Sequence, residues 1–269
     1  MQTENTHWFV FCGGSILLQC PREADAPYTI PLSPVPPLPT KEWTFIQELP
    51  DATDGLPCRA YTITSPMPLE GHIFAGLRES YPRLNHEDYL MAGKAAELLY
   101  WDSGTRYCGV CGAPMKRTTA ISKQCTHCGK EVWPQVSPAI IVRIRRTDDK
   151  GRDQILMVHA RNFRRSEMYG LVAGFVETGE TLEQCVEREV REETHLRIKN
   201  IRYFASQPWP YPCGIMIGFT ADYAGGELAL QAEEISQAGW FSRDKLPPVP
   251  EKLSIARQLI DDWMNLKAE

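Results

Sequence analysis

Three glutamates of one short segment, Glu189, Glu192 and Glu193, have the residue type and spacing to bind a metal ion. On a helix that turns about 100° per residue, Glu189 and Glu193 fall on the apolar arc and Glu192 lies at its edge. Inward carboxylates repel one another, and each costs several kcal/mol or so to desolvate without a partner. One arginine, Arg188, does not neutralise three of them, whereas Mg²⁺ or Mn²⁺ binds such clustered oxygens. The alternative is a surface helix whose glutamates are solvated. It is disfavoured because Glu189 and Glu193 fall on the apolar side of the helix.

A second metal site is predicted from two CxxC pairs. Cys108 and Cys111 form the first pair and Cys125 and Cys128 the second, and a glycine follows each pair. This spacing is typical of a tetrahedral four-thiolate zinc site of structural type. A thioredoxin-like redox pair would need only one CxxC in a βαβ setting. His127 is an alternative ligand that the regularity of the pairs disfavours.

Five basic residues surround the cysteine pairs. Such charges most often form a solvated face, and the other interpretation is that they guide a phosphate-rich substrate or RNA. They are Arg106, Lys116, Arg117, Lys123 and Lys130.

Two aromatic residues lie in a proline-rich stretch at 206–212, SQPWPYP. The prolines restrict the backbone around Trp209 and Tyr211, and rigid rings in a loop suit stacking on a base or nicotinamide, at very roughly 1 to 3 kcal/mol per base. The rings could equally cover the core from a stiffened loop. The residues alone leave both interpretations open.

The elements that must position these side chains alternate between strands and helices, which predicts an α/β layered domain. A capping box of Thr181 and Gln184 begins a helix over 182–194. We expect a turn at 148–151, a closing amphipathic helix over 254–266, and strands over 139–145, 154–159, 169–173, 201–206, 215–223 and 239–242.

The first 103 residues contain no motif with a chemical interpretation of its own. Two strands within 8–18 are predicted to form a hairpin through Gly13 and Gly14. Seven prolines between 21 and 39 predict an extended surface loop. A strand over 59–64 and a helix capped by Asn85 and running through residue 100 complete this part.

Composition places the chain among ordinary globular proteins and limits its partners. Of 269 residues, 43% are hydrophobic and 23% charged. The net charge of -5 argues against general electrostatic binding of nucleic acid. No signal peptide or membrane span is expected. Nine cysteines, an odd and unevenly placed number, form a poor disulfide framework, so we expect a reducing cytoplasm.

The glutamate segment resembles the Nudix box of the Nudix hydrolases. The resemblance rests on Gly174, Glu180, the run 188–190, the pair 192–193 and Leu196. One position departs from the family, because His195 stands where the family has glycine. We expect a left-handed backbone there, which glycine adopts freely and histidine only occasionally. The departure concerns the turn after the helix and leaves the metal ligands in place.

A narrower resemblance, from about residue 106 to the C-terminus, is to the NADH pyrophosphatase subfamily. Residues 206–214 are similar to its SQPWPFPxS array, with Tyr211 in place of Phe and Gly214 in place of Ser, and the subfamily has a four-cysteine ribbon in the same order. The resemblance implies cleavage of NADH or NAD⁺ to nicotinamide mononucleotide and AMP, and removal of a 5′ NAD cap from RNA in bacterial members. It also implies a homodimer whose substrate pocket forms near the subunit contact.

The same resemblance implies a fold and a division of the chain. We expect a Nudix α/β/α sandwich with a mixed sheet over 133–269, a zinc ribbon over 104–132 and a smaller α+β domain over 1–103.

Residue roles follow from matching positions. The resemblance implies catalysis by Glu189, Glu192 and Glu193, with Mg²⁺ or Mn²⁺ held by Glu189, Glu193, the Ala173 carbonyl and Glu234. Glu233 is a rival to Glu234, and Arg188 is expected to orient Glu180 rather than to touch substrate. The implied substrate contacts are Arg78, Trp133, Phe175, Gln207, Pro208, Trp209, Pro210, Tyr211, Pro212, Cys213, Gly214 and Ala256.

Two other functions compete with this one. The box alone also fits a Nudix enzyme that acts on ADP-ribose or a nucleotide sugar. A non-enzymatic nucleotide sensor, with the ribbon as its nucleic-acid module, is a rival of another class. Such a sensor is expected to lose box carboxylates, and this chain keeps all of them.

Overall fold

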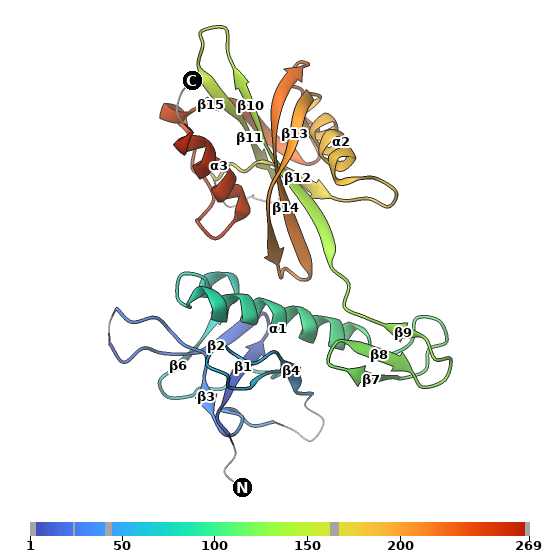
Figure 1. The fold of residues 1–269 in the computed structure, drawn as a ribbon. Coiled ribbons are helices and arrows are strands. Elements are labelled where there is room, and N and C mark those ends of the chain that lie inside the picture. The colour runs from blue at the N-terminus through green and yellow to red at the C-terminus, as the bar shows by residue number, and fades with distance from the viewer. Residues whose placement is uncertain (1–3, 24, 41–44, 162–166, 267–269) are drawn as a thin grey trace. The chain divides into compact units, whose positions relative to one another are not determined.

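The computed structural model describes residues 4–23, 25–40, 45–161 and 167–266 (Figure 1). Its contacts define two compact units, residues 1–135 with 210–213 and residues 136–209 with 214–269. The four-cysteine ribbon therefore groups with the N-terminal part of the chain. Within the described residues, no helix has the length and apolarity needed to cross a membrane.

The first unit contains a sheet in the order β4-β5-β1-β2-β6, with β3 paired to β1. The predicted hairpin is confirmed, because Gly13 and Gly14 join β1 to β2 with φ of 56° and 84°. The proline-rich segment is not entirely loop, since it includes β3, and strands β4 and β6 were not predicted. The strands are β1 Thr6–Cys12, β2 Ser15–Gln19, β3 Leu32–Ser33, β4 Gln47–Leu49, β5 Cys58–Thr62 and β6 His72–Gly76.

A short 3₁₀ helix, η1 (Arg78–Ser80), leads to helix α1 (His86–Gly104). Asn85 caps α1 as predicted, because the Asp88 backbone N–H donates to its side-chain oxygen at 2.8 Å. The helix ends four residues later than predicted, and its last turn buries Trp101.

The ribbon consists of β7 (Met115–Thr119), β8 (Ser122–Cys125) and β9 (Glu131–Val132). Two of its basic residues do not belong to a solvated face. Arg117 and Lys123 both pair with Asp102 near the end of α1, at 2.6 and 2.8 Å, and Lys123 is buried. Their charges join the ribbon to the helix, because a buried ammonium needs such a partner.

The second unit contains a mixed sheet in the order β13-β14-β10-β11-β15, with β12 paired to β10. Strands β10 and β14 are parallel, and the other pairs are antiparallel. The strands are β10 Ser137–Thr147, β11 Asp153–Ala160, β12 Val172–Phe175, β13 Arg197–Trp209, β14 Gly214–Gly225 and β15 Ile235–Ser242.

Helices α2 (Leu182–Thr194) and α3 (Ile255–Asn265) cover opposite faces of this sheet (Figure 1). Side chains alternate along β10, so Ile140, Val142 and Ile144 pack with α2 while Ile141 packs with α3. The predicted α/β/α sandwich is confirmed. A one-turn 3₁₀ helix, η3 (Arg243–Lys245), lies between β15 and α3.

All six predicted strands of this sheet have different bounds in the structure; β10, β11 and β15 extend beyond the predicted residues, β15 by four residues at its start. Strand β12 begins at Val172 rather than at residue 169, and Gly170 contributes only an isolated bridge to Val158. Strand β13 extends to Trp209, and strand β14 begins at Gly214. The first half of the proline-rich array is therefore strand rather than loop. Pro208 is tolerated because β13 is an edge strand.

One carboxylate of α1, on the partly buried Glu97, has a buried oxygen without a hydrogen bond. Glu97 Oε1 has no partner among residues that the structure describes. Burial raises the pKa of Glu97 from its ordinary 4.5 to about 7. The Glu97 carboxyl therefore stays protonated to a higher pH in the folded protein than in the unfolded chain. The contribution of this residue to the free energy of unfolding is fully present below pH 4.5 and is lost as the pH rises through about 7.

We predict that Glu97→Gln unfolds at a higher urea concentration than wild type at pH 8, and that the difference shrinks toward pH 4.5. The glutamine cannot ionise, so the variant avoids roughly 1 to 2 kcal/mol, a value reduced for solvent screening. Glu48→Gln, on an exposed position of β4, is the matched control and should show no such trend. A pH-independent difference at Glu97 would contradict the prediction.

Candidate functional site

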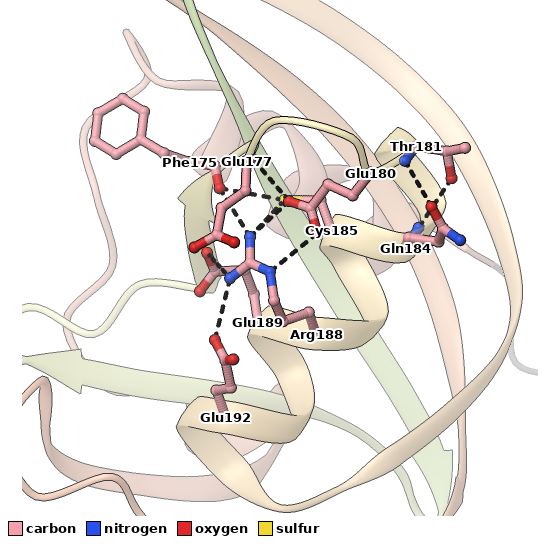
Figure 2. Close-up of polar contacts among 9 residues, drawn as sticks. All are labelled: Phe175, Glu177, Glu180, Thr181, Gln184, Cys185, Arg188, Glu189 and Glu192. Atoms are coloured by element: carbon pink, nitrogen blue, oxygen red, sulfur yellow. Dashed lines mark hydrogen bonds and ion pairs between the residues drawn. The ribbon is translucent and has the colours of Figure 1, made fainter.

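The turn before α2 is ordered by local hydrogen bonds (Figure 2). Thr181 and Gln184 form the predicted capping box, with the backbone N–H of each donating to the side chain of the other at 2.8 and 3.2 Å. The Glu180 carboxylate accepts from the backbone N–H of Glu177 at 2.7 Å. These contacts order the chain that leads from β12 into the first turn of α2.

Arg188 connects the glutamates of this turn and helix (Figure 2). Its guanidinium donates to both oxygens of Glu180 at 2.7 and 3.0 Å, and to Glu189 and Glu192 at 2.9 and 3.1 Å. It also donates to the Phe175 carbonyl at 2.9 Å. This pairing holds the pKa of Glu180 at about 2. The expectation that Arg188 orients Glu180 is confirmed.

Glu189 and Glu193 are buried, with exposed fractions of 8% and 4%, as the helical phase predicted. Glu193 Oε2 has no hydrogen-bond partner within the described part of the chain. Burial, followed by repulsion from Glu189 and Glu234, raises the pKa of Glu193 to about 8. Burial likewise raises the pKa of Glu189, although Arg188 opposes the shift. A buried oxygen without a donor fits a position where a cation binds.

Gly174 provides the space that the Glu189 carboxylate occupies. A Cβ at this position would lie 1.9 Å from Glu189 Oε1, which no real contact allows. The carboxylate therefore lies directly against strand β12, next to Ala173. This arrangement, with the unpartnered Glu193 oxygen, fits a divalent cation held by carboxylates and a backbone carbonyl.

Glu234 is the better placed of the two rival glutamates. Its charge raises the pKa values of both Glu189 and Glu193. The turn that contains it is attached to the end of α2, because the Gln231 backbone N–H donates to the Glu193 carbonyl at 3.1 Å. Glu234 itself is exposed, so it can approach a cation from the solvent side.

His195 adopts the left-handed conformation predicted for it, with φ of 59° at the C-cap of α2. Its Nδ1 lies 3.0 Å from the Ala229 carbonyl oxygen. The Ala229 backbone N–H in turn donates to the Thr194 carbonyl at 3.1 Å. Contacts with one neighbouring segment thus support the residue that replaces glycine.

The four cysteines of the ribbon converge on one point. The Sγ atoms of Cys108, Cys111, Cys125 and Cys128 all lie within 4.8 Å of one another, with pairs at 3.4 and 3.6 Å. Four thiolates around one zinc ion at about 2.3 Å from each sulfur would have comparable separations. His127 does not belong to the cluster, and its backbone N–H donates to Cys125 Sγ at 3.4 Å.

Comparisons with known proteins agree with both halves of the chain. The NUDIX domain family matches residues 137–263, and the family described as "NADH pyrophosphatase-like rudimentary NUDIX domain" matches residues 5–101. The "NAD-capped RNA hydrolase NudC" of Pseudomonas aeruginosa (strain LESB58) is 38% identical over 232 residues, which cover 83% of this chain and 81% of that protein. The chain belongs to the NudC group of the Nudix family.

A second relative and one solved structure extend the comparison. The "NAD-capped RNA hydrolase NudC" of Pectobacterium atrosepticum is 46% identical over 179 residues, 66% of each chain. A NUDIX hydrolase from Nitrosomonas europaea matches in structure with a TM-score of 0.50 at 19% identity, covering 59% of this chain and 90% of that one. At this identity the structural match supports the fold alone.

The proline-rich array at 206–214 divides between the two units. Gln207 lies in β13, and its amide is engaged by the start of α3: it donates to the Leu253 carbonyl at 2.7 Å and accepts from the Ile255 backbone N–H at 2.8 Å. Pro208 is exposed and Trp209 is partly buried. At Gly214 a Cβ would lie 3.2 Å from the Trp209 carbonyl oxygen, so the backbone is tight at this position.

The tip of the array, residues 210–213, belongs to the first unit and lies on α1. The hydroxyls of Tyr211 and Tyr89 are 2.7 Å apart. Pro210 packs against Gly93, where a Cβ would come within 3.1 Å of the proline ring. Pro212 is exposed and Cys213 partly buried. Tyr89 was not predicted, since no local pattern marks a helical tyrosine as the partner of a distant loop.

The other predicted substrate contacts differ in exposure. Phe175, at the end of β12, is 66% exposed, and Trp133, after β9, is 49% exposed. Exposed rings of this size suit ligand stacking. Ala256 is buried in the apolar cluster beneath α3, and Arg78 lies in η1 of the first unit.

We predict that the purified protein contains one zinc ion per chain by elemental analysis, and that Cys125→Ser loses both the zinc and several degrees of thermal stability. Four thiolates held by zinc contribute folding free energy directly. Cys20→Ser, which removes a free thiol outside the cluster, is the control. Zinc-free wild type with an unchanged melting temperature would refute a structural zinc.

Proposed function

We propose that this protein hydrolyses the pyrophosphate of NAD(H) to nicotinamide mononucleotide and AMP, and removes the 5′ NAD cap of RNA. The observation that supports the proposal most directly is the pair of buried carboxylates, Glu189 and Glu193, one with an unpartnered oxygen, on the box helix of a NudC-type chain. Such a cluster binds the divalent cations that pyrophosphate chemistry requires.

The metal-binding residues in this proposal are Glu189, Glu193, Glu234 and the Ala173 carbonyl. Bound Mg²⁺ or Mn²⁺ would neutralise the pyrophosphate oxygens and activate water. The chain itself supplies positioning, which dominates phosphoryl transfer. Arg188 fixes Glu189 and Glu180. Glu192, whose side chain is 52% exposed, lies beside them and can accept a proton from water.

The substrate end of the proposal rests on Phe175 and Trp209, which would stack on a ring of the nucleotide. Phe175 is the last residue of β12, and Arg188 and Cys185 donate to its carbonyl oxygen. The Phe175 backbone is thus anchored to the metal-binding helix although its ring is exposed. A ring bound here would lie close to the carboxylates that act on the pyrophosphate.

Four finer features complete the proposal: the catalytic cation, the metal of the ribbon, the oligomeric state and the compartment. The catalytic cation is Mg²⁺ or Mn²⁺, and zinc occupies the ribbon. The protein acts as a homodimer in the cytoplasm.

We predict that Glu193→Gln lowers kcat/KM for NADH with Mg²⁺ by roughly 10²-fold or more, because a metal-binding charge is lost. The metal-free variant should melt at the same or a higher temperature, since burial penalises the charged form of Glu193. Glu187→Gln, on the exposed face of the same helix, is the matched control. Near-normal turnover of Glu193→Gln would rule out the metal-carboxylate mechanism.

We predict that Trp209→Ala lowers kcat/KM about 10- to 100-fold for NADH and NAD-capped RNA, and much less for ADP-ribose, which has no nicotinamide. The expected loss corresponds to one stacked ring. Tyr203→Ala removes an aromatic side chain that is 62% exposed on the same strand, and should leave all three substrates unaffected. Equal losses on all three substrates would show that the Trp209 ring only packs.

A further inference from the structure

A polar hollow of about 220 Å³ lies on the second unit, away from the metal-binding carboxylates. Three arginines contribute to it, together with one acidic and three uncharged residues. Its lining is Arg143, Arg145, Asn200, Arg202, Thr220, Ala221 and Asp222.

The hollow lies on the α3 face of the sheet. Arg143 alternates along β10 with residues that pack under α2, and it donates to the Leu259 carbonyl of α3 at 3.2 Å. Thr220 of β14 is in register with Arg143 on one side and with Arg202 of β13 on the other. Three adjacent strands thus place Arg143 on one side of Thr220 and Arg202 on the other. The box helix, with its glutamates, packs on the opposite face.

Arg143 has a donor that the protein does not use. The residue is 6% exposed, and its Nη1 pairs with Asp262 at 2.8 Å. Its Nε is buried and has no partner in the described ranges. A buried N–H without an acceptor is costly, by about 1 to 3 kcal/mol, so an acceptor is expected at this position. The arginine lines the hollow, where a ligand could supply that acceptor.

The remaining charges leave the hollow with a positive excess. Arg145 is paired with Asp153 at 2.6 Å. Asp222 accepts a hydrogen bond from the Asn200 side chain at 2.8 Å. Arg202 is exposed and forms no ion pair with any described residue. Arg202, without an ion-pair partner among the described residues, and Arg143, whose buried Nε has no acceptor among them, therefore both line the hollow.

We propose that this hollow is a binding site for a phosphate group. Guanidinium groups bind phosphate oxygens with paired, charge-assisted hydrogen bonds, and the Thr220 hydroxyl offers one more donor. The phosphate belongs to a free nucleotide or to an RNA backbone, because both present the same oxygens. The site is separate from the box carboxylates, and its existence does not depend on the proposed hydrolysis.

The Arg143 side-chain N–H provides a direct test by NMR. Isotope-labelled protein without added divalent cation is titrated with inorganic phosphate, and separately with a dinucleoside monophosphate that has a single phosphodiester. We expect the Arg143 Nε–H resonance to shift in a saturable way. Arg202→Ala, which removes an exposed side chain, should weaken this binding about three- to tenfold.

Lys199→Ala is the matched control, because Lys199 has the same charge and lies on the same strand without lining the hollow. Equal weakening by both variants, or an Arg143 resonance unmoved by either probe, would overturn the proposal. A response to inorganic phosphate alone would assign the site to terminal phosphates of free nucleotides. A response to the diester would assign it to an RNA backbone.

Discussion

The burial of like-charged carboxylates on one helix is the constraint on which the rest of the second unit depends. Glu189 and Glu193 are nearly inaccessible to solvent, and burial, with added repulsion from neighbouring carboxylates, raises the pKa values of both. Left alone, such a pair would destabilise the fold or remain protonated. The glycine at 174, the tight pairing of β12 with β10 and the turn that holds Glu234 all fit this arrangement. The sheet thus holds in place a cluster of carboxylates whose burial costs free energy.

Arg188 reduces that cost without removing it. Its guanidinium contacts Glu180, Glu189, Glu192 and the Phe175 carbonyl, so its donors are already committed to the turn and the helix. Glu193 lies beyond the reach of these contacts and keeps an oxygen without a hydrogen bond. One side of the cluster is therefore neutralised by protein and the other is left for a cation. This asymmetry leaves Glu193 as the buried carboxylate whose pKa no neighbouring cation of the described residues lowers.

Features with a local cause could be predicted from the sequence. The capping box, the helix from 182 to 194, the inward phase of Glu189 and Glu193 and the left-handed His195 all follow from spacing within a few residues. Features made by distant partners could not. The spacing of residues does not predict that Arg117 and Lys123 both pair with Asp102. It also does not predict the contact between the hydroxyls of Tyr211 and Tyr89, or the hydrogen bonds of the Gln207 amide with the start of α3. The short edge strands β4 and β6 were missed for the same reason, because their pairing partners and not their own residues define them.

The two metal sites differ in how far the protein closes them. The four cysteine sulfurs already lie within 4.8 Å of one another, and backbone N–H groups of Val110, His127 and Cys128 donate to two of them. Four protein ligands leave no position for a substrate, which is the arrangement of a structural zinc site. The carboxylate site is built differently, since Glu192 and Glu234 are exposed while Glu189 and Glu193 are buried. A cation bound there would be held from one side only and would keep positions for water and phosphate oxygens.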